Sequence, residues 1–442
     1  MTASAFDSAI YRDLLGDAET ARLFSDGAVI RAMLLVEGAL AKAQGAAGLI
    51  PETAAAAIHR AALEVSIDPA ALSEETGRNG VVVPALVSAF RAEIGAPEHA
   101  QYVHWGATSQ DIMDTALILR LRQVLTLWEE RLRRTIRALG TLAETHADLP
   151  MAGRTYGQAA SPVSFGQVCA QWGTPLLRHL DRLDELRPRL LRISLSGAAG
   201  TLSAMGEHGP EIRAELARGL DLGDPVGSWH ATRDTVAELA GWATLVSGSL
   251  AKMGEDLTLM VQSGIAEVRL PSTGGSSTMP QKQNPVAPSV LVALNAHVSA
   301  QNAALQGAVL HRQQRDGAAW FTEWMALPPL AAATGRALAV GAELSAGLVP
   351  NADAMAGNLD DGLGLIHAEA LSFTLARDMP RPEAQNVVKA LCQEAMRTGT
   401  PLPDLLARDR PGRDWHKIAT GAAQLGTAPD EARAFAAAAR TA

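Results

Sequence analysis

The densest group of reactive side chains in this sequence lies over residues 274–285, which read GGSSTMPQKQNP. Paired glycines relax the backbone and two prolines disfavour a helix or an interior strand, so the segment is predicted to be a loop. Between Ser276 and Asn284 it carries hydroxyls, carboxamides and the ammonium of Lys282. Such a loop can close over an anion and bring a hydroxyl to a carbon acid, although an ordinary flexible connection has a similar composition.

Two further polar segments come directly before long helical patterns. Residues 104–111 read HWGATSQD, and residues 153–162 read GRTYGQAASP. Hydroxyls and free amides at a helix N-terminus favour a bound carboxylate. The alternative for each segment is a simple N-cap, because Ser, Thr and Asp are common capping residues. That all three segments carry small hydroxyl donors and precede a long helix favours a function in anion binding.

The elements that must position these segments are predicted to be helices. Apolar residues recur at spacings of three and four, whereas strand-like alternation is almost absent. A span of about 30 residues would form a helix about 45 Å long. Pro288 is predicted to open the last of the long helices. The sequence thus predicts an all-α protein with a central long-helix bundle. The long helical spans that it predicts along the whole chain are 29–44, 115–146, 164–191, 232–260 and 290–310.

The length of 442 residues allows two or three domains. We expect an N-terminal helical domain over 1–105, a central bundle over 106–350 and a C-terminal helical domain over 351–442. Within the bundle, the connection 264–287 is longer than the usual loop, which favours a functional role.

Composition argues against several classes of partner. The formal net charge of -9 and the lack of a Lys/Arg run give no footprint for nucleic acid. Asp7, Arg12 and Asp13 interrupt the apolar core that a secretory signal would need, and no stretch approaches about 18 uncharged apolar residues. We therefore expect a cytoplasmic protein with no membrane partner. The two cysteines are predicted to be small buried hydrophobic residues. No metal-binding or dinucleotide motif occurs, so we expect an enzyme without a cofactor or metal.

The three polar segments together carry a family resemblance. SSTMPQKQN matches the S-S-x-M-P-x-K-x-N signature of the fumarase/aspartase superfamily, VHWGATSQD resembles its H-x-G-x-T-S-x-D segment, and GRTYGQAASP is similar to its R-T-H-x-Q-x-x-x-P segment. The motifs occur in the family order across nearly the whole chain. The resemblance implies a three-domain fold with a central long-helix bundle, and a homotetramer whose active sites combine segments of different subunits.

A finer resemblance is to the bacterial 3-carboxy-cis,cis-muconate cycloisomerases, which form a lactone in protocatechuate (beta-ketoadipate) catabolism. It rests on the segments SGAAGTLSAMGEHG, SWHATRD and WFTEWMALP. Tyr156 departs from the pattern, which has His in most of the superfamily and usually Trp in the cycloisomerases; Gln281 and Gln283 stand where His and Arg are common. An adenylosuccinate lyase or another amine-eliminating lyase is the alternative, and a non-catalytic paralogue is a third.

The resemblance also implies roles for individual residues. Ser276 would move the proton on or off carbon, and Lys282 would stabilise its alkoxide. Arg233 is a candidate clamp because a guanidinium pairs bidentately with a carboxylate, and Asp111 would orient its loop. Arg315 is a further cation that a substrate with three carboxylates could use. The positions expected to bind the polycarboxylate substrate are His104, Thr108, Ser109, Arg154, Thr155, Tyr156, Gln158, Arg233, Ser277 and Asn284.

The residue at position 156 bears on the type of reaction. A lyase that expels an amine or hydroxide must protonate the leaving group, a task suited to histidine. In lactonisation the internal nucleophile is a carboxylate, which leaves in the reverse direction as a stable anion. The absence of histidine at Tyr156 therefore favours a lactone-forming enzyme. The alternative is that the phenol of Tyr156 itself serves as the acid.

Overall fold

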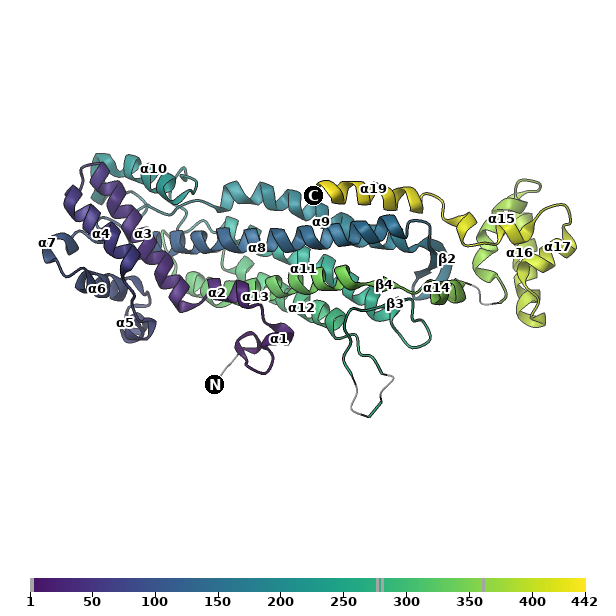
Figure 1. The fold of residues 1–442 in the computed structure, drawn as a ribbon. Coiled ribbons are helices and arrows are strands. Elements are labelled where there is room, and N and C mark those ends of the chain that lie inside the picture. The colour runs from purple at the N-terminus through teal and green to yellow at the C-terminus, as the bar shows by residue number, and fades with distance from the viewer. Residues whose placement is uncertain (1–3, 276–277, 280–281, 360–361) are drawn as a thin grey trace. The chain divides into compact units, whose positions relative to one another are not determined.

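The structure is a computed structural model that describes the chain except for residues 1–3, 276–277, 280–281 and 360–361. The described chain is mainly helical, with two small two-stranded sheets (Figure 1). The predicted all-α class, built on long helices, is confirmed. No helix in the described ranges combines the length and apolarity that crossing a membrane requires.

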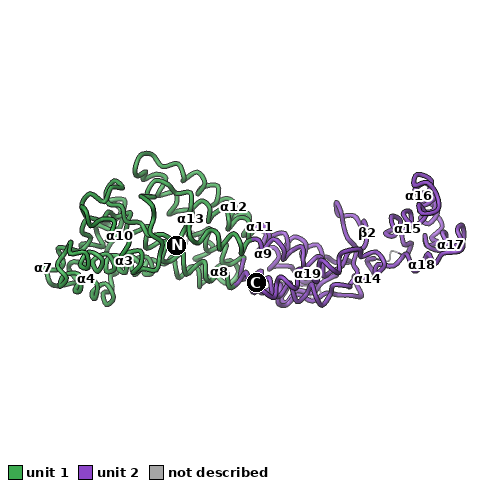
Figure 2. The backbone as a smooth tube through the Cα atoms, turned by 90° about the horizontal axis from the view of Figure 1, so that it is seen from above, with its two compact units in different colours: residues 1–130, 179–247, 294–337 green, residues 131–178, 248–293, 338–442 purple. Residues whose placement is uncertain are grey.

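The chain divides into two compact units (Figure 2). Unit 1 comprises Met1–Glu130, His179–Ser247 and Leu294–Ala337, and unit 2 comprises Arg131–Arg178, Gly248–Ala293 and Leu338–Ala442. The boundaries between these ranges fall inside long helices, so several helices contribute residues to both units. The three-domain division at residues 105 and 350 stays a prediction.

Five long helices account for the predicted bundle. Four of them match predicted spans, and the span predicted at 29–44 is α3, Asp26–Ala46. Pro288 lies in the first turn of its helix, as predicted, and the helix begins at Val286; a proline there lacks only an N–H that would have no partner within the helix. The helices are α8 Ser109–Thr145, α9 Phe165–Leu190, α11 Asp234–Met260, α12 Val286–Gly307 and α13 Gly317–Gly347.

Helix α13 was not among the predicted spans. It contains Pro328 and Pro329 and is apolar around most of its circumference, so it shows little of the periodicity of a surface helix. Leu327, Leu330 and Ala331 are all buried. A helix enclosed by neighbours does not need a polar face, which is why its sequence pattern gave no clear signal.

The remaining elements of unit 1 are short helices around α3. They are α1 Arg12–Leu15, α2 Ala18–Leu23, α4 Glu52–Glu64, α5 Ser73–Asn79, α6 Val83–Ile94, α7 Pro97–Ala100 and α10 Gly209–Leu220, with 3-10 turns at Ala5–Asp7, Pro69–Leu72 and Ser203–His208.

In unit 2 two antiparallel strand pairs and a set of C-terminal helices complete the fold. The strands are β1 Pro150–Thr155 with β2 Gln158–Ser164, and β3 Val268–Arg269 with β4 Val349–Pro350. The helices are α14 Ala352–Leu359, α15 Ala368–Leu375, α16 Arg381–Thr398, α17 Leu402–Asp409, α18 Trp415–Ile418 and α19 Ala428–Thr441, with 3-10 turns at Leu365–His367 and Ala422–Gln424.

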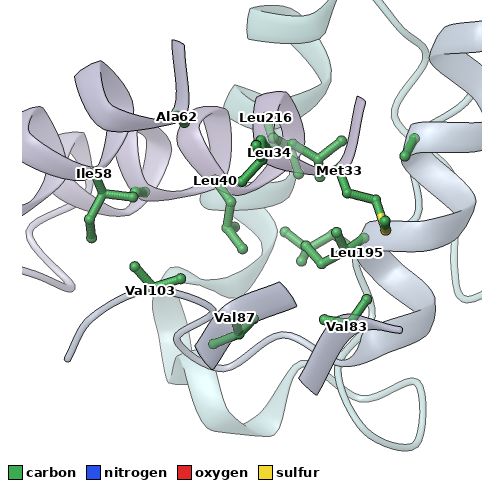
Figure 3. Close-up of a cluster of buried hydrophobic side chains, with 14 of the residues drawn as sticks. Met33, Leu34, Leu40, Ile58, Ala62, Val83, Val87, Val103, Leu195 and Leu216 are labelled. Atoms are coloured by element: carbon green, nitrogen blue, oxygen red, sulfur yellow. The ribbon is translucent and has the colours of Figure 1, made fainter. Parts of the chain in front are cut away.

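The core of unit 1 depends on close packing of α3 against α4. Ser25 caps α3 by accepting a hydrogen bond from the backbone N–H of Ala28. Buried side chains of both helices, among them Leu40 and Ile58, meet in one apolar cluster (Figure 3). Gly38 of α3 faces α4 so closely that an added Cβ would lie 2.6 Å from the Cβ of Ala62. The glycine thus lets the two backbones approach.

We predict that Gly38→Ala lowers the free energy of unfolding by about 1–3 kcal/mol, because the added methyl overpacks this contact. The matched control is Gly241→Ala in the interior of α11, where an added Cβ meets nothing within 4 Å. That change should leave stability unchanged or raise it by about 0.5–1 kcal/mol, since alanine is the better helix former. Urea unfolding of both variants measures the difference, and equal stabilities would contradict the close approach.

Candidate active site

The segment before α8 carries a paired histidine. His104 adopts a left-handed backbone conformation with φ of 65°. Its Nδ1 lies 2.7 Å from Oε1 of Glu37 on α3, and the Glu37 side chain is only 1% exposed. Burial by itself lowers the pKa of His104, but the charge of the Glu37 carboxylate and its hydrogen bond outweigh burial and raise this pKa above the ordinary 6.5. The pairing with Glu37 therefore favours the protonated form of His104.

Asp111 organises the turn that leads into α8. Its buried carboxylate accepts hydrogen bonds from the backbone N–H groups of Thr108 at 3.0 Å, Ser196 at 2.8 Å and Gly197 at 2.9 Å. Nε2 of His230 lies 2.8 Å from Oδ1 of the same carboxylate. These contacts suit the orienting role inferred from the sequence, because they fix the backbone around Thr108 rather than leave the carboxylate open to a substrate.

Arg315 brings a cation to the same turn. Its Nη2 lies 3.3 Å from the Thr108 hydroxyl, and its Nε donates to Gln110 at 2.8 Å. Arg315 is exposed, and within the described residues no carboxylate pairs with it. Ser109 is the first residue of α8, where the helix dipole favours an anion. Thr108, Ser109 and Arg315 therefore form a group suited to binding a carboxylate.

Arg233 does not fit the role of a substrate clamp. It is 1% exposed, and its guanidinium donates to both oxygens of Asp114, at 2.7 and 3.1 Å, and to both oxygens of Glu323, one of them at 3.0 Å. Burial lowers the pKa of Arg233, but the two carboxylates more than offset this and raise it. Four of its five N–H groups donate to these two carboxylates. Arg233 is therefore better suited to a structural role than to binding a substrate.

The third motif forms a hairpin rather than a simple entry into a helix. Thr155 pairs with Gln158, so that Tyr156 and Gly157 make the two-residue turn, with φ of 52° and 74°. Positive φ at both turn positions is typical of a type I′ hairpin turn. The Tyr156 side chain is fully exposed at its tip. The sequence showed no clear alternation here because the strands are short and rich in small residues.

Arg154 also pairs with the protein itself. Its two terminal nitrogens donate to the two oxygens of Glu267, at 2.9 and 2.8 Å. Glu267 is fully buried and accepts a further hydrogen bond from Asn358 at 3.0 Å. The pair joins the hairpin to the segment just before the reactive loop, so Arg154 is better placed to position the loop than to clamp substrate. Glu267 lies in none of the three motifs, and sequence reasoning missed it.

The reactive loop is closed at its base by backbone hydrogen bonds. Gly274 and Asn284 exchange N–H···O bonds of 3.0 and 2.9 Å, and the Lys282 N–H donates to the Met279 carbonyl at 3.0 Å. Lys282 is exposed, and no carboxylate of the described residues pairs with its ammonium. Ser276 and Ser277 lie outside the described residues.

We predict that Glu37→Gln lowers the pKa of His104 below its ordinary 6.5, because burial then acts without the opposing carboxylate. In the wild type, the stability from the pair is fully present below about pH 6.5 and is lost as pH rises through the higher pKa of folded His104. The stability difference between wild type and variant should therefore shrink as pH rises. Proton NMR titration of the imidazole C–H signals measures the pKa, with His104→Gln assigning the resonance. A wild-type pKa at or below 6.5 would contradict the proposed pairing.

Comparisons with known proteins agree with these features. Over residues 9–299 the chain matches the protein family described as Lyase. A 3-carboxy-cis,cis-muconate cycloisomerase of Pseudomonas aeruginosa is 41% identical over 85% of this chain and 83% of the relative. An N-acetyl-S-(2-succino)cysteine lyase of Enterococcus italicus is 32% identical over 92% of this chain and 90% of the relative.

A solved structure extends the similarity to the fold. The crystal structure of 3-carboxy-cis,cis-muconate lactonizing enzyme from Pseudomonas putida matches with a TM-score of 0.93 at 35% identity, covering 98% of this chain and 99% of that chain. The resemblance drawn from the three motifs is confirmed. The chain belongs to the lyase family and has the fumarase/aspartase-type fold.

Proposed function

We propose that the protein catalyses the reversible anti lactonisation of 3-carboxy-cis,cis-muconate to 4-carboxymuconolactone, a step of protocatechuate catabolism. The observation that carries this proposal is the similarity to a relative and a solved structure of that activity over most of both chains. Chemical support comes from the residue at the hairpin tip and from Lys282 and Arg315, which pair with no carboxylate among the described residues.

The reaction rearranges bonds within one molecule. An oxygen of one substrate carboxylate forms a C–O bond to an alkene carbon, while the alkene electron pair moves to the neighbouring carbon alpha to another carboxylate. The resulting aci-carboxylate is discharged when that carbon takes a proton, which we assign to the Ser276 hydroxyl. Ser276 then regains a proton from solvent, so no atom is lost and no cofactor is needed.

We assign three cationic side chains, those of Lys282, Arg315 and His104, to the substrate. Among the described residues no carboxylate pairs with Lys282 or Arg315, whereas His104 pairs with Glu37, which raises its pKa. Lys282, with backbone amides of its loop, would also stabilise the alkoxide of Ser276 when water leaves the site. Fixed donors of this kind are each worth about a hundredfold to a thousandfold in rate. The neutral groups proposed to complete the binding of the substrate are Thr108, Ser109, Thr155, Gln158, Ser277 and Asn284.

An elimination reaction is the competing proposal. The relative named N-acetyl-S-(2-succino)cysteine lyase is 32% identical across most of both chains, so this family includes enzymes named for other chemistry. An amine-eliminating lyase, such as an adenylosuccinate lyase, needs an acid for its leaving group. Tyr156, exposed at the hairpin tip, offers only a phenol for that task. A non-catalytic paralogue is the third alternative.

The assembly and location follow from the family resemblance alone. We propose a cytoplasmic homotetramer in which each active site combines the reactive loop, the hairpin and the turn before α8 from different subunits. Sedimentation analysis of the purified protein would test the tetramer.

The central prediction is that the purified protein consumes 3-carboxy-cis,cis-muconate, seen as loss of ultraviolet absorbance, and has no activity on adenylosuccinate. Ser276→Ala should lower turnover by about a hundredfold or more, because the carbon loses its proton donor. Ser289→Ala is the matched control, since Ser289 is exposed and its hydroxyl donates to the Pro285 carbonyl. Activity on adenylosuccinate without activity on the muconate would support the elimination reaction. Unchanged turnover in Ser276→Ala would refute the assignment of Ser276 as the proton donor. Inactivity on both substrates would support a non-catalytic paralogue.

Tyr156→Phe tests whether the leaving group needs an acid. We expect kcat for lactonisation to stay within about threefold of wild type, whereas losing a general acid typically costs about a hundredfold or more. Steady-state kinetics in both directions measure the effect. A loss of a hundredfold in both directions would show that the phenol transfers a proton and would remove the argument drawn from position 156.

A further inference from the structure

Unit 1 contains a cavity of about 350 Å³ that the proposed reaction does not use. Residues of α3, α8 and α13 line it together with residues between them, and Thr108, Ser109 and Arg315 do not. Its volume lies at the lower end of the range for small-molecule sites, which is about 300–1,000 Å³. The apolar part of the lining includes Phe24, Met33, Met113, Leu117, Trp324 and Leu327.

Arg120 lines this cavity, and no carboxylate of the described chain is bound to it. Arg120 is only 9% exposed. Its Nε donates to the Ala116 carbonyl at 3.2 Å and its Nη1 to the Leu23 carbonyl at 3.3 Å, which leaves three of its five N–H groups. Within the described residues no carboxylate pairs with it. Burial lowers the pKa of Arg120 to about 10, so the guanidinium remains charged at neutral pH.

Two arginines outside this cavity, one buried and one partly exposed, are compensated differently. Arg233 and Arg154 each make bidentate pairs with buried carboxylates. A buried charge is costly unless it is paired. Arg120 has instead two carbonyl oxygens and the ring of Phe24, whose centroid lies 5.5 Å from the guanidinium carbon. An anionic ligand would supply the missing partner and could use the unoccupied N–H groups.

The acidic residues of the lining limit which anion fits. Asp114 and Glu323 face the cavity, but both are bound to Arg233, and Asp26 is exposed. A second negative charge on the ligand would therefore meet carboxylates rather than cations. The aromatic rings and thioethers of the lining favour a flat aromatic body.

We propose that this cavity is a binding site for a small aromatic monocarboxylate, with its carboxylate on Arg120 and its ring among Phe24, Met113 and Trp324. The site stands apart from the residues assigned to lactonisation and does not depend on that function. It would allow a benzoate-like acid to bind to the folded enzyme without occupying the Thr108–Arg315 group.

Isothermal titration of the full-length protein with benzoate tests the proposal. We expect one site per chain with a Kd of about 1 mM or tighter, and no measurable binding of the neutral analogue benzamide. Arg120→Met should weaken benzoate binding by about tenfold or more, because the charge-assisted bonds are lost while most of the side-chain stem remains. Arg122→Met is the matched control, because Arg122 lies on the same helix but donates to the Leu220 and Asp221 carbonyls and is not part of the lining.

Two more variants separate this cavity from the candidate active site. Leu117→Trp should fill the cavity and reduce benzoate binding without removing a charge, whereas Arg315→Met should leave the Kd unchanged. Circular dichroism and urea unfolding confirm that each variant is folded. The proposal is overturned by absence of binding at about 10 mM benzoate, by equal affinity in wild type and Arg120→Met, or by loss of binding in Arg315→Met.

Discussion

The buried carboxylate of Asp111 is the interaction on which the candidate site in unit 1 depends. A carboxylate inside a protein is costly unless it is well hydrogen-bonded. Asp111 meets that requirement with backbone N–H groups from Thr108, Ser196 and Gly197 and with the imidazole of His230. These partners come from three separate parts of the chain. Satisfying one buried charge therefore fixes the turn that presents the hydroxyls of Thr108 and Ser109 at the start of α8.

The arginines around the proposed chemistry differ in what compensates their charge. Arg233 and Arg154 are held by buried carboxylates and act as structural cations. Arg315 is exposed beside a hydroxyl, and Arg120 is buried against carbonyl oxygens and a ring. Arg233 and Arg154 hold segments together, whereas Arg315 and Arg120 keep N–H donors available for an anion. Such a division is invisible in the sequence, because an arginine looks the same in both settings.

The two strands of the hairpin place position 156 at an exposed tip. A two-residue turn with positive φ at Tyr156 and Gly157 leaves the phenol in solvent. No core contact constrains which side chain stands there. A substitution at this tip is therefore expected to leave the core contacts of unit 2 unchanged.

How much of the fold and of the candidate site could be predicted depends on how far apart in the sequence the interacting residues lie. Helices such as α8 and α11 follow from local periodicity, so most of their bounds were predicted to within a few residues. The exception is the start of α8, which lies at Ser109, six residues before the predicted position. The hairpin was missed because its strands are short and rich in small residues, and α13 was missed because it lacks a polar face.

The amino-acid sequence by itself determined the helical class, the three motifs and, through them, the family. Only the tertiary structure decided which charges pair: Glu37 with His104 across 67 residues, Arg233 with Glu323 across 90 and Arg154 with Glu267 across 113. The reason is physical. Periodicity and motif spacing are local properties of the chain, whereas the pairing of a buried charge is set by whichever distant segment the folded core brings within hydrogen-bonding distance.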